Sequence, residues 1–190
     1  MFDMGPYYLT ALCALMGGVK EVCGMTATTF PTRTVTSQPK FGTVVEVEVP
    51  TYVSGTLRFE TGAVGNIITP FDVWNSTLPR IEIYGTKGTL LVPDPNGFGG
   101  PVLLSTLDGG GFREVPLTHG YAENSRGIGV ADMAQCILDG RTDNRANGKN
   151  AAHVLEIMCA VHTASDSNST YFMTTPYQVA APMPAGLAKG

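Results

Sequence analysis

Residues 52–70 have the sequence YVSGTLRFETGAVGNIITP, in which two β-strand patterns flank a short turn. Apolar and polar side chains alternate over 57–60, which is typical of a strand with one buried face. The pair Thr61-Gly62 places a glycine where the chain has to reverse. The stretch therefore predicts an antiparallel hairpin, formed by strands at 52–60 and 63–70.

Strand patterns continue on both sides of this hairpin. The run at 44–49 alternates cleanly, and a glycine-containing turn at 85–88 joins two strands in a second hairpin. The segment at 29–41, which is rich in threonine and contains two prolines, is expected to be a loop. The further strands are expected at 19–28, 44–49, 80–84, 89–92, 101–105 and 112–117, with a last strand or extended tail at 171–179.

Helical patterns occur at the two ends of the chain. The first helix is expected from Asp3 to Met16, where Gly17-Gly18 ends it. A second helix ends at Gly140, and a third follows with Asn147 as a plausible N-cap. Their apolar stripes, which we expect to face the core, consist of Val130, Met133, Ala134, Ile137 and Leu138 in the second helix and Ala151, Val154, Leu155, Met158 and His162 in the third.

One helix, a run of antiparallel strands and then two helices make the α+β class, with a large, mostly antiparallel open sheet and helices packed on one face. Apolar residues occur on both faces of several strands. We therefore expect the second face of the sheet to be buried against another copy of the chain, in a homo-oligomer.

Composition limits the function classes. The chain has 190 residues, 43% of them hydrophobic and 15% charged, which fits a soluble globular domain. A net charge of −4 without a Lys/Arg cluster argues against nucleic acid as a partner. No apolar run is long enough to span a membrane, and no signal peptide is expected.

The cysteines and histidines give no metal-binding pattern. Cys13, Cys23, Cys136 and Cys159 are widely separated in the sequence, and the three histidines have no ligand spacing. We expect the cysteines to be buried and reduced, as in a cytoplasmic protein. His153 lies one step off an apolar stripe, where a hydrogen-bonded core histidine is more common than a catalytic one.

Asp3 and Tyr7 are four positions apart, so a helix starting near residue 3 would place both on one face. Such a pair is either a helix cap beside a core tyrosine or half of a polar site. Arg126 and Asp132 flank the start of the second helix. Arg126 is a candidate contact for an anion or hydroxyl, although an exposed arginine is the commoner outcome. Asp132 lies opposite the apolar stripe, on a solvated face or near a cleft.

The N-terminal segment Met1-Phe2-Asp3-Met4-Gly5-Pro6-Tyr7-Tyr8-Leu9 resembles the start of the C-terminal domain of the glucose-fructose oxidoreductase/inositol dehydrogenase/MocA (Gfo/Idh/MocA) family. The resemblance covers most of residues 1–175. Further matching blocks are Ile83-Tyr84-Gly85-Thr86-Lys87-Gly88-Thr89-Leu90, Pro93-Asp94-Pro95-Asn96, Arg126-Gly127-Ile128-Gly129-Val130-Ala131-Asp132-Met133-Ala134 and His153-Val154-Leu155-Glu156-Ile157-Met158.

The resemblance implies the second half of a two-domain oxidoreductase that acts on sugars or polyols with NAD or NADP. Residues 1–180 would form the substrate-binding and oligomerisation domain, with a dihydrodipicolinate reductase-like fold, and 181–190 a flexible tail. The nucleotide would be bound by an N-terminal Rossmann domain that is absent from this chain, so the chain alone would not transfer hydride. Gly127-Ile128-Gly129 does not replace that domain, because Asp132 stands at the third glycine position and no strand precedes the motif.

The resemblance also assigns roles to residues. Asp3 and Tyr7 would be the catalytic pair, and Arg126, Trp74 and Asp132 would contact the substrate. The family pattern is Asp-x-x-x-His, and this chain has Tyr7 in place of the histidine. Because tyrosine is protonated at neutral pH, Tyr7 would orient a hydroxyl or carbonyl and not abstract a proton, unless a lysine of the absent domain activates it. The alternative is a non-catalytic assembly module with a vestigial pocket.

Overall fold

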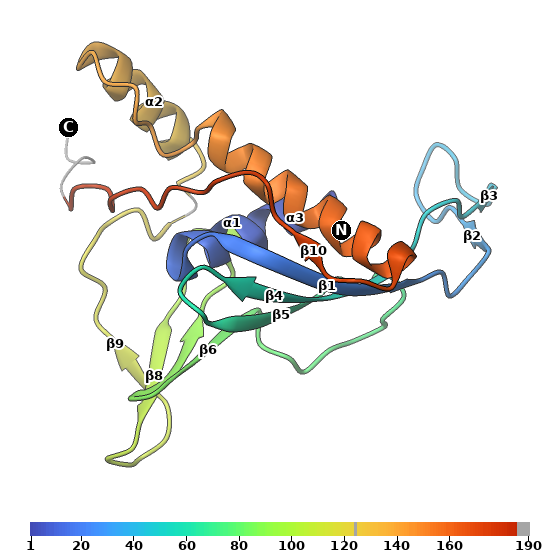
Figure 1. The fold of residues 1–190 in the computed structure, drawn as a ribbon, viewed down its shortest axis with the longest axis horizontal. Helices are drawn as coiled ribbons and strands as arrows, with labels where there is room; N and C mark the ends of the chain where they lie inside the picture. Colours follow the sequence, from blue (N-terminus) through green and yellow to red (C-terminus); the bar gives the residue numbers. More distant parts are fainter. Residues whose placement is uncertain (124, 186–190) are drawn as a thin grey trace. The chain divides into compact units, whose positions relative to one another are not determined.

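The structure of the protein is a computed structural model that describes residues 1–123 and 125–185 (Figure 1). They divide into two compact units. The first unit comprises residues 1–76 and 149–179, and the second comprises 77–148 with the C-terminal segment from Ala180 onward. In the described part of the chain, no helix is both long enough and apolar enough to cross a lipid bilayer.

The first unit is built on a four-stranded antiparallel sheet with the strand order β10-β1-β4-β5. Its central hairpin is the one predicted from residues 52–70, and Gly62 in the turn has a φ of +89°, a conformation that glycine adopts without strain. The predicted hairpin and the predicted strand at 19–28 are therefore confirmed. The strands are β1 (Val19–Ala27), β4 (Tyr52–Phe59), β5 (Val64–Ile68) and β10 (Tyr171–Phe172).

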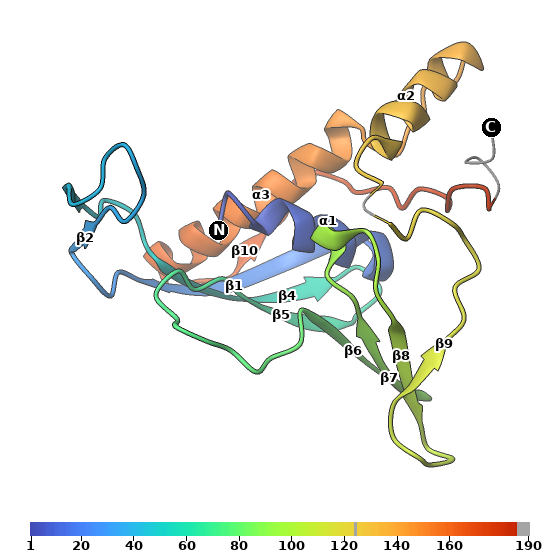
Figure 2. The ribbon, with the colours of Figure 1, turned by 180° about the vertical axis from the view of Figure 1, so that it is seen from behind.

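Helices α1 (Gly5–Met16) and α3 (Gly148–Ser167) lie over one face of this sheet, as Figures 1 and 2 both show. Alternate β4 residues, among them Leu57 and Phe59, point to the helices and are fully buried. They form one core with apolar residues of both helices, namely Leu9, Cys13, Val154, Ile157, Met158, Ala160 and Val161. The opposite face of the sheet carries no helix of the first unit.

Two helix predictions need correction. Helix α1 begins at Gly5, with Met4 as its N-cap residue, so Asp3 lies before the helix and does not cap it. In α3 the buried face includes Val154 and Met158 as predicted, but Leu155 is half exposed. Buried Asn150 and His153 make polar contacts on the buried side, and these contacts help set which face turns inward.

A small hairpin projects from the ends of β1 and β4 (Figure 2). Strands β2 (Thr32–Thr34) and β3 (Val44–Glu46) pair antiparallel, which corrects the expected loop at 29–41 and the longer strand at 44–49. The Arg33 guanidinium anchors the hairpin, because it pairs with the buried Asp72 carboxylate and lies 4.4 Å from the centroid of the Phe71 ring.

The second unit contains another four-stranded antiparallel sheet, with the order β6-β7-β8-β9. Its strands match the predicted ones closely, so the α+β class with antiparallel sheets is confirmed. The strands of the whole described chain are shared among three separate hydrogen-bonded sheets. The elements of the second unit are β6 (Ile81–Gly85), β7 (Gly88–Val92), the 3-10 helix η1 (Pro95–Gly97), β8 (Val102–Thr106), β9 (Arg113–Val115) and α2 (Ile128–Leu138).

Helix α2 is oriented opposite to the prediction. Its apolar stripe is exposed, with Ile137 71% and Leu138 81% accessible to solvent. Asp132, for which we expected a solvated face or a position near a cleft, is only 4% exposed, and Cys136 only 2%. The buried Asp132 carboxylate is paired with Arg145, as a carboxylate out of water requires a charged or hydrogen-bonded partner.

Candidate functional site

The expected catalytic pair lies at the start of the first unit. Asp3 is in the turn before α1, and Tyr7 is in the first turn of that helix. Both side chains are exposed, and within residues 1–123 and 125–185 neither makes a hydrogen bond or an ion pair. A carboxylate that can accept and a phenol that can donate are therefore both available to a ligand.

Trp74 follows β5 in a loop of the same unit. Its side chain is 96% exposed, so it projects from the surface. The loop is fixed two residues earlier, where the Asp72 carboxylate pairs with Arg33 and accepts a hydrogen bond from the Thr51 hydroxyl. Trp74 is thus a free aromatic surface on an anchored loop, suited to stacking against an apolar face of a ligand or partner.

Arg126 lies in the second unit, just before α2. One terminal nitrogen of its guanidinium, Nη2, donates to the Asn96 carbonyl oxygen (3.2 Å) and to Asn96 Oδ1 (3.0 Å). The guanidinium carbon lies 5.7 Å from the centroid of the Phe98 ring. The residue is exposed, and its other guanidinium nitrogens have no partner in the described part of the chain. These contacts orient the group and leave donors for an anion or for hydroxyls.

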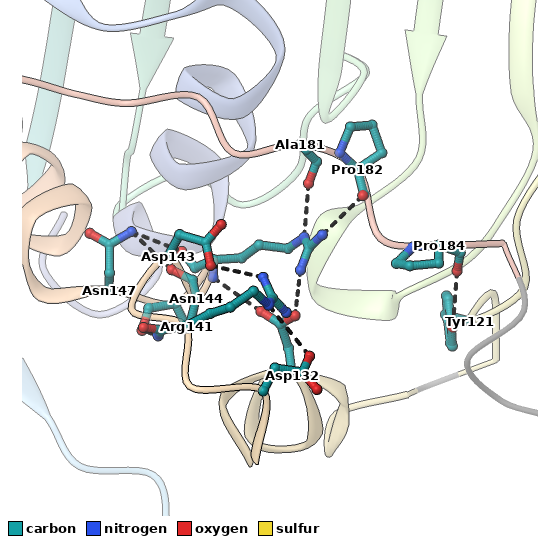
Figure 3. Close-up of polar contacts among 12 residues, drawn as sticks. Tyr121, Asp132, Arg141, Asp143, Asn144, Asn147, Ala181, Pro182 and Pro184 are labelled. Carbon is teal, nitrogen blue, oxygen red and sulfur yellow. Dashed lines mark hydrogen bonds and ion pairs between the residues drawn. The ribbon is translucent and has the colours of Figure 1, made fainter. Parts of the chain in front are cut away.

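Asp132 is engaged within the protein. One carboxylate oxygen pairs with the Arg145 guanidinium, and the other accepts the Arg145 backbone N–H at 3.0 Å (Figure 3). The structure therefore places Asp3, Tyr7 and Trp74 in the first unit, and Arg126 and Asp132 in the second.

Sequence reasoning missed a polar ladder along α3. His153 is fully buried; its Nδ1 donates to the Thr175 carbonyl oxygen at 2.7 Å, and its Nε2 accepts from the backbone N–H of Val19 at 3.0 Å. This pattern requires the neutral Nδ1–H tautomer. The expectation of a satisfied core histidine is confirmed.

Asn150 and Glu156 lie one turn before and one turn after His153. Asn150 exchanges two hydrogen bonds with the backbone of Gln178. Burial tends to raise the pKa of Glu156, but hydrogen bonds from Thr175 and Thr174 dominate and lower it to about 2. The signal was present in the sequence, since polar residues three positions apart share a helix face.

The cysteine prediction is half right. All four cysteines are free; Cys13 and Cys136 are buried as expected, whereas Cys23 and Cys159 are exposed. Cys23 lies on β1 and Cys159 on α3, at positions that face away from the shared core. In the described residues, no three side chains of His, Cys, Asp or Glu are grouped so as to hold a metal ion.

The segment from Gly127 to Asp132 does not fit the phosphate-binding glycine motif of dinucleotide-binding proteins. A phosphate-binding motif of the form G-x-G-x-x-G needs a strand before it and a glycine at the last of its three glycine positions. Here a loop precedes Gly127, and the third position is Asp132, whose carboxylate would repel a phosphate and is paired with Arg145. No step of a reaction is therefore assigned to a nucleotide bound by this chain.

Residues 1–91 match the family model described as the GFO/IDH/MocA C-terminal domain. No curated protein matches the chain. Solved structures match over almost the whole chain: levoglucosan dehydrogenase in its apo form (20% identity, 92% of this chain, 51% of that chain, TM-score 0.70) and an NAD binding oxidoreductase from Klebsiella pneumoniae (21% identity, 91% and 50%, TM-score 0.71).

A third similar structure is aldose-aldose oxidoreductase from Caulobacter crescentus in complex with glycerol (20% identity, 90% of this chain, 46% of that chain, TM-score 0.62). Levoglucosan dehydrogenase has also been solved with NADH and levoglucosan. The chain spans about half the length of these solved proteins. At these identities the structural likeness establishes the fold. The family model therefore matches the first 91 of the 190 residues, and the likeness in fold extends over almost the whole chain.

Proposed function

We propose that this chain is the substrate-binding and oligomerisation half of an NAD- or NADP-dependent oxidoreductase of sugars or polyols. The observation that carries the proposal is the family match, which begins at the segment holding Asp3 and Tyr7. Support comes from solved proteins of the same fold that are about twice as long and include a levoglucosan dehydrogenase with bound NADH. The nucleotide would be bound by a separate domain, and the free cysteines suit a reducing compartment such as the cytoplasm.

In this proposal Asp3 and Tyr7 make different hydrogen bonds to the substrate. The Asp3 carboxylate accepts a hydrogen bond from a sugar hydroxyl or from a lysine of the nucleotide-binding domain. The Tyr7 phenol donates to the oxygen whose carbon is oxidised or reduced. Both groups are exposed and have no partner in the described chain, so substrate would not have to displace an internal contact.

Arg126 and Trp74 are the proposed substrate contacts. Asn96 and Phe98 orient the Arg126 guanidinium, and its remaining N–H groups can donate hydrogen bonds to vicinal hydroxyls of a sugar. The exposed Trp74 ring offers an apolar surface to the C–H face of a sugar. Asp132 is not proposed as a direct contact, because both of its carboxylate oxygens are occupied by Arg145.

The proposed oligomer forms through the uncovered face of the first sheet. Exposed apolar residues lie on this face of three strands, including Met25, Val64 and Ile68. Such a patch marks a protein interface more often than free surface. The same face supports the second candidate, a non-catalytic assembly module, which the replacement of the family histidine by Tyr7 also favours.

The test joins this chain to a nucleotide-binding domain of the family and follows NADH and NADPH turnover with a panel of sugars and polyols. Asp3→Asn and Tyr7→Phe are expected to lower kcat/KM by about 100-fold or more if the two groups act on the reacting oxygen. Asp108→Asn and Tyr84→Phe, which change exposed residues of the second unit, are the matched controls.

Turnover that both site variants leave unchanged would show the site assignment to be wrong. A fusion that binds the nucleotide but turns over no sugar or polyol would instead favour the assembly module. Saturable binding of NADH by the 190-residue chain alone would contradict the proposal that a separate domain binds the nucleotide.

A further inference from the structure

Helix α2 buries its polar side and exposes its apolar side. Asp132 and Cys136, one turn apart, face inward, whereas Val130, Ile137 and Leu138 face solvent. An amphipathic helix held by apolar burial has the opposite orientation. Polar contacts must therefore contribute much of what holds this helix.

The contacts converge on Arg145, in the segment between α2 and α3. Its guanidinium pairs with Asp132 and donates through Nε to the Ala181 carbonyl oxygen (2.8 Å) and through Nη2 to the Pro182 carbonyl oxygen (2.9 Å). Figure 3 shows Asp132 of the helix and the Ala181 and Pro182 carbonyls in this region. One arginine thus joins α2 to the C-terminal segment.

The C-terminal segment suits this contact. It is held again at Pro184, whose carbonyl oxygen accepts from the Tyr121 hydroxyl at 3.3 Å. Pro182 and Pro184 have no N–H and a fixed φ, so the segment is extended and offers carbonyl acceptors to the donors of Arg145 and Tyr121. Residues 181–184, expected within a flexible tail, are therefore anchored at three carbonyls.

We propose that residues 180–185, Arg145 and Asp132 form a latch that keeps α2 in its polar-side-inward orientation. When the latch is open, α2 loses its main restraint and can turn or detach, which exposes Cys136. The latch is a conformational device of the second unit, and it holds whether or not the proposed function is correct.

A second arginine provides a matched control. Arg141 follows the same helix and makes ion pairs with Asp139 and Asp143, but all three are exposed and none has a hydrogen bond or ion pair to residues 180–185, the described part of the C-terminal segment. Figure 3 shows Arg141 with Asp143. Exposed pairs contribute little, whereas removal of one partner from a buried pair is costly.

Cys136 is the reporter. In a Cys23→Ser/Cys159→Ser background, the remaining thiols are the buried Cys13 and Cys136. Burial raises the pKa of Cys13 to about 12, so its labelling by a thiol reagent at pH 8 reports unfolding of the first unit. Arg145→Met is expected to increase the labelling rate of Cys136 about 100-fold, and Arg141→Met less than about twofold. Tyr121→Phe, which removes only the Pro184 contact, is expected to give a several-fold increase.

Hydrogen exchange distinguishes an open latch from an unfolded unit. The proposal expects faster exchange in α2 while β6–β9 keep their protection. It is overturned if Cys136 in Arg145→Met labels no faster than in Arg141→Met. It is also overturned if α2 and β6–β9 lose protection together in both Arg145→Met and Tyr121→Phe.

Discussion

The Nε2 atom of His153 lies 3.0 Å from the backbone nitrogen of Val19, across 134 positions of sequence. Val19 is the first residue of β1, directly after the Gly17-Gly18 end of α1. The other ring nitrogen of His153 donates to Thr175 on the C-terminal side. One buried imidazole therefore joins the start of the sheet, the long helix and the last segment of the first unit.

Replacement of this imidazole should be costly. His153→Ala leaves the Val19 N–H and the Thr175 carbonyl oxygen unpaired and opens a cavity, so we expect the free energy of unfolding to fall by about 3 kcal/mol. Urea denaturation followed by circular dichroism measures the change. His119→Ala, at an exposed histidine, is the control and should stay within about 0.5 kcal/mol of the parent. A loss below about 1 kcal/mol for His153→Ala would contradict the structural role.

Glu156 gives the first unit a pH dependence. Its pKa is about 2 in the folded protein, against an ordinary value of 4.5. A carboxyl group whose pKa is lower in the folded protein than in the unfolded protein stabilises the folded state when it is ionised. The stabilisation is therefore complete above about pH 4.5 and is lost as the pH falls toward 2. Glu156→Gln should lower the free energy of unfolding by about 2 kcal/mol at pH 7, and the difference from the parent should shrink below pH 4.5. Denaturation curves between pH 7 and pH 2.5 test this, and a difference that stays constant with pH would exclude the charged contact.

Gly24 marks a close approach of β1 to α3. A Cβ atom at this position would lie 2.5 Å from the Val161 carbonyl oxygen and 2.7 Å from Val161 Cγ1. Gly24→Ala should therefore destabilise the protein by about 2 kcal/mol, because backbone atoms of a buried helix cannot move aside easily. At Gly120 a Cβ would meet nothing within 4 Å, so Gly120→Ala is the matched substitution. Equal melting temperatures for the two variants would mean that β1 and α3 are farther apart than described.

The uncovered sheet face should mediate self-association. Val64 is 58% exposed on β5, opposite Arg58 of β4. Val64→Glu replaces an exposed apolar side chain of this face by a carboxylate that a dimer interface would have to desolvate, so we expect the proposed dimer to weaken at least about tenfold. Sedimentation equilibrium at micromolar concentration measures the dissociation constant. Leu107→Glu, on an exposed loop of the second unit, should leave the dissociation constant unchanged. A parent chain that is still monomeric at about 50 µM would rule the dimer out.

Local sequence was enough for the strands and their turns. The alternation over 57–60 and the glycine at position 62 specify a hairpin through neighbours that are close in sequence, and the structure contains that hairpin. The end of α1 at Gly17 follows from the same kind of local preference, since φ there is +95°. Gly5 as the start of α1 was less predictable, because helix starts depend on caps that several nearby residues could supply.

The candidate site was predicted in part. Asp3, Tyr7 and Arg126 are exposed with groups available for a ligand, and their roles toward a substrate stay predictions. The predicted environment of Asp132 was wrong, because its partner Arg145 lies 13 residues away in a segment with no periodic signal. The polar ladder of α3 was missed for a related reason: its partners are backbone groups of the C-terminal segment, which sequence does not locate.

The amino-acid sequence by itself predicted the three helices, the strands of the two four-stranded sheets and the resemblance to a family, because these depend on periodicity, turn residues and short motifs, whereas strand β2 was missed. Tertiary structure alone decided which side of α2 is buried and which face of α3 meets the sheet. Periodicity within a helix cannot locate the partner of a buried carboxylate, and the folded chain supplies it by bringing Arg145 and the C-terminal carbonyls to Asp132.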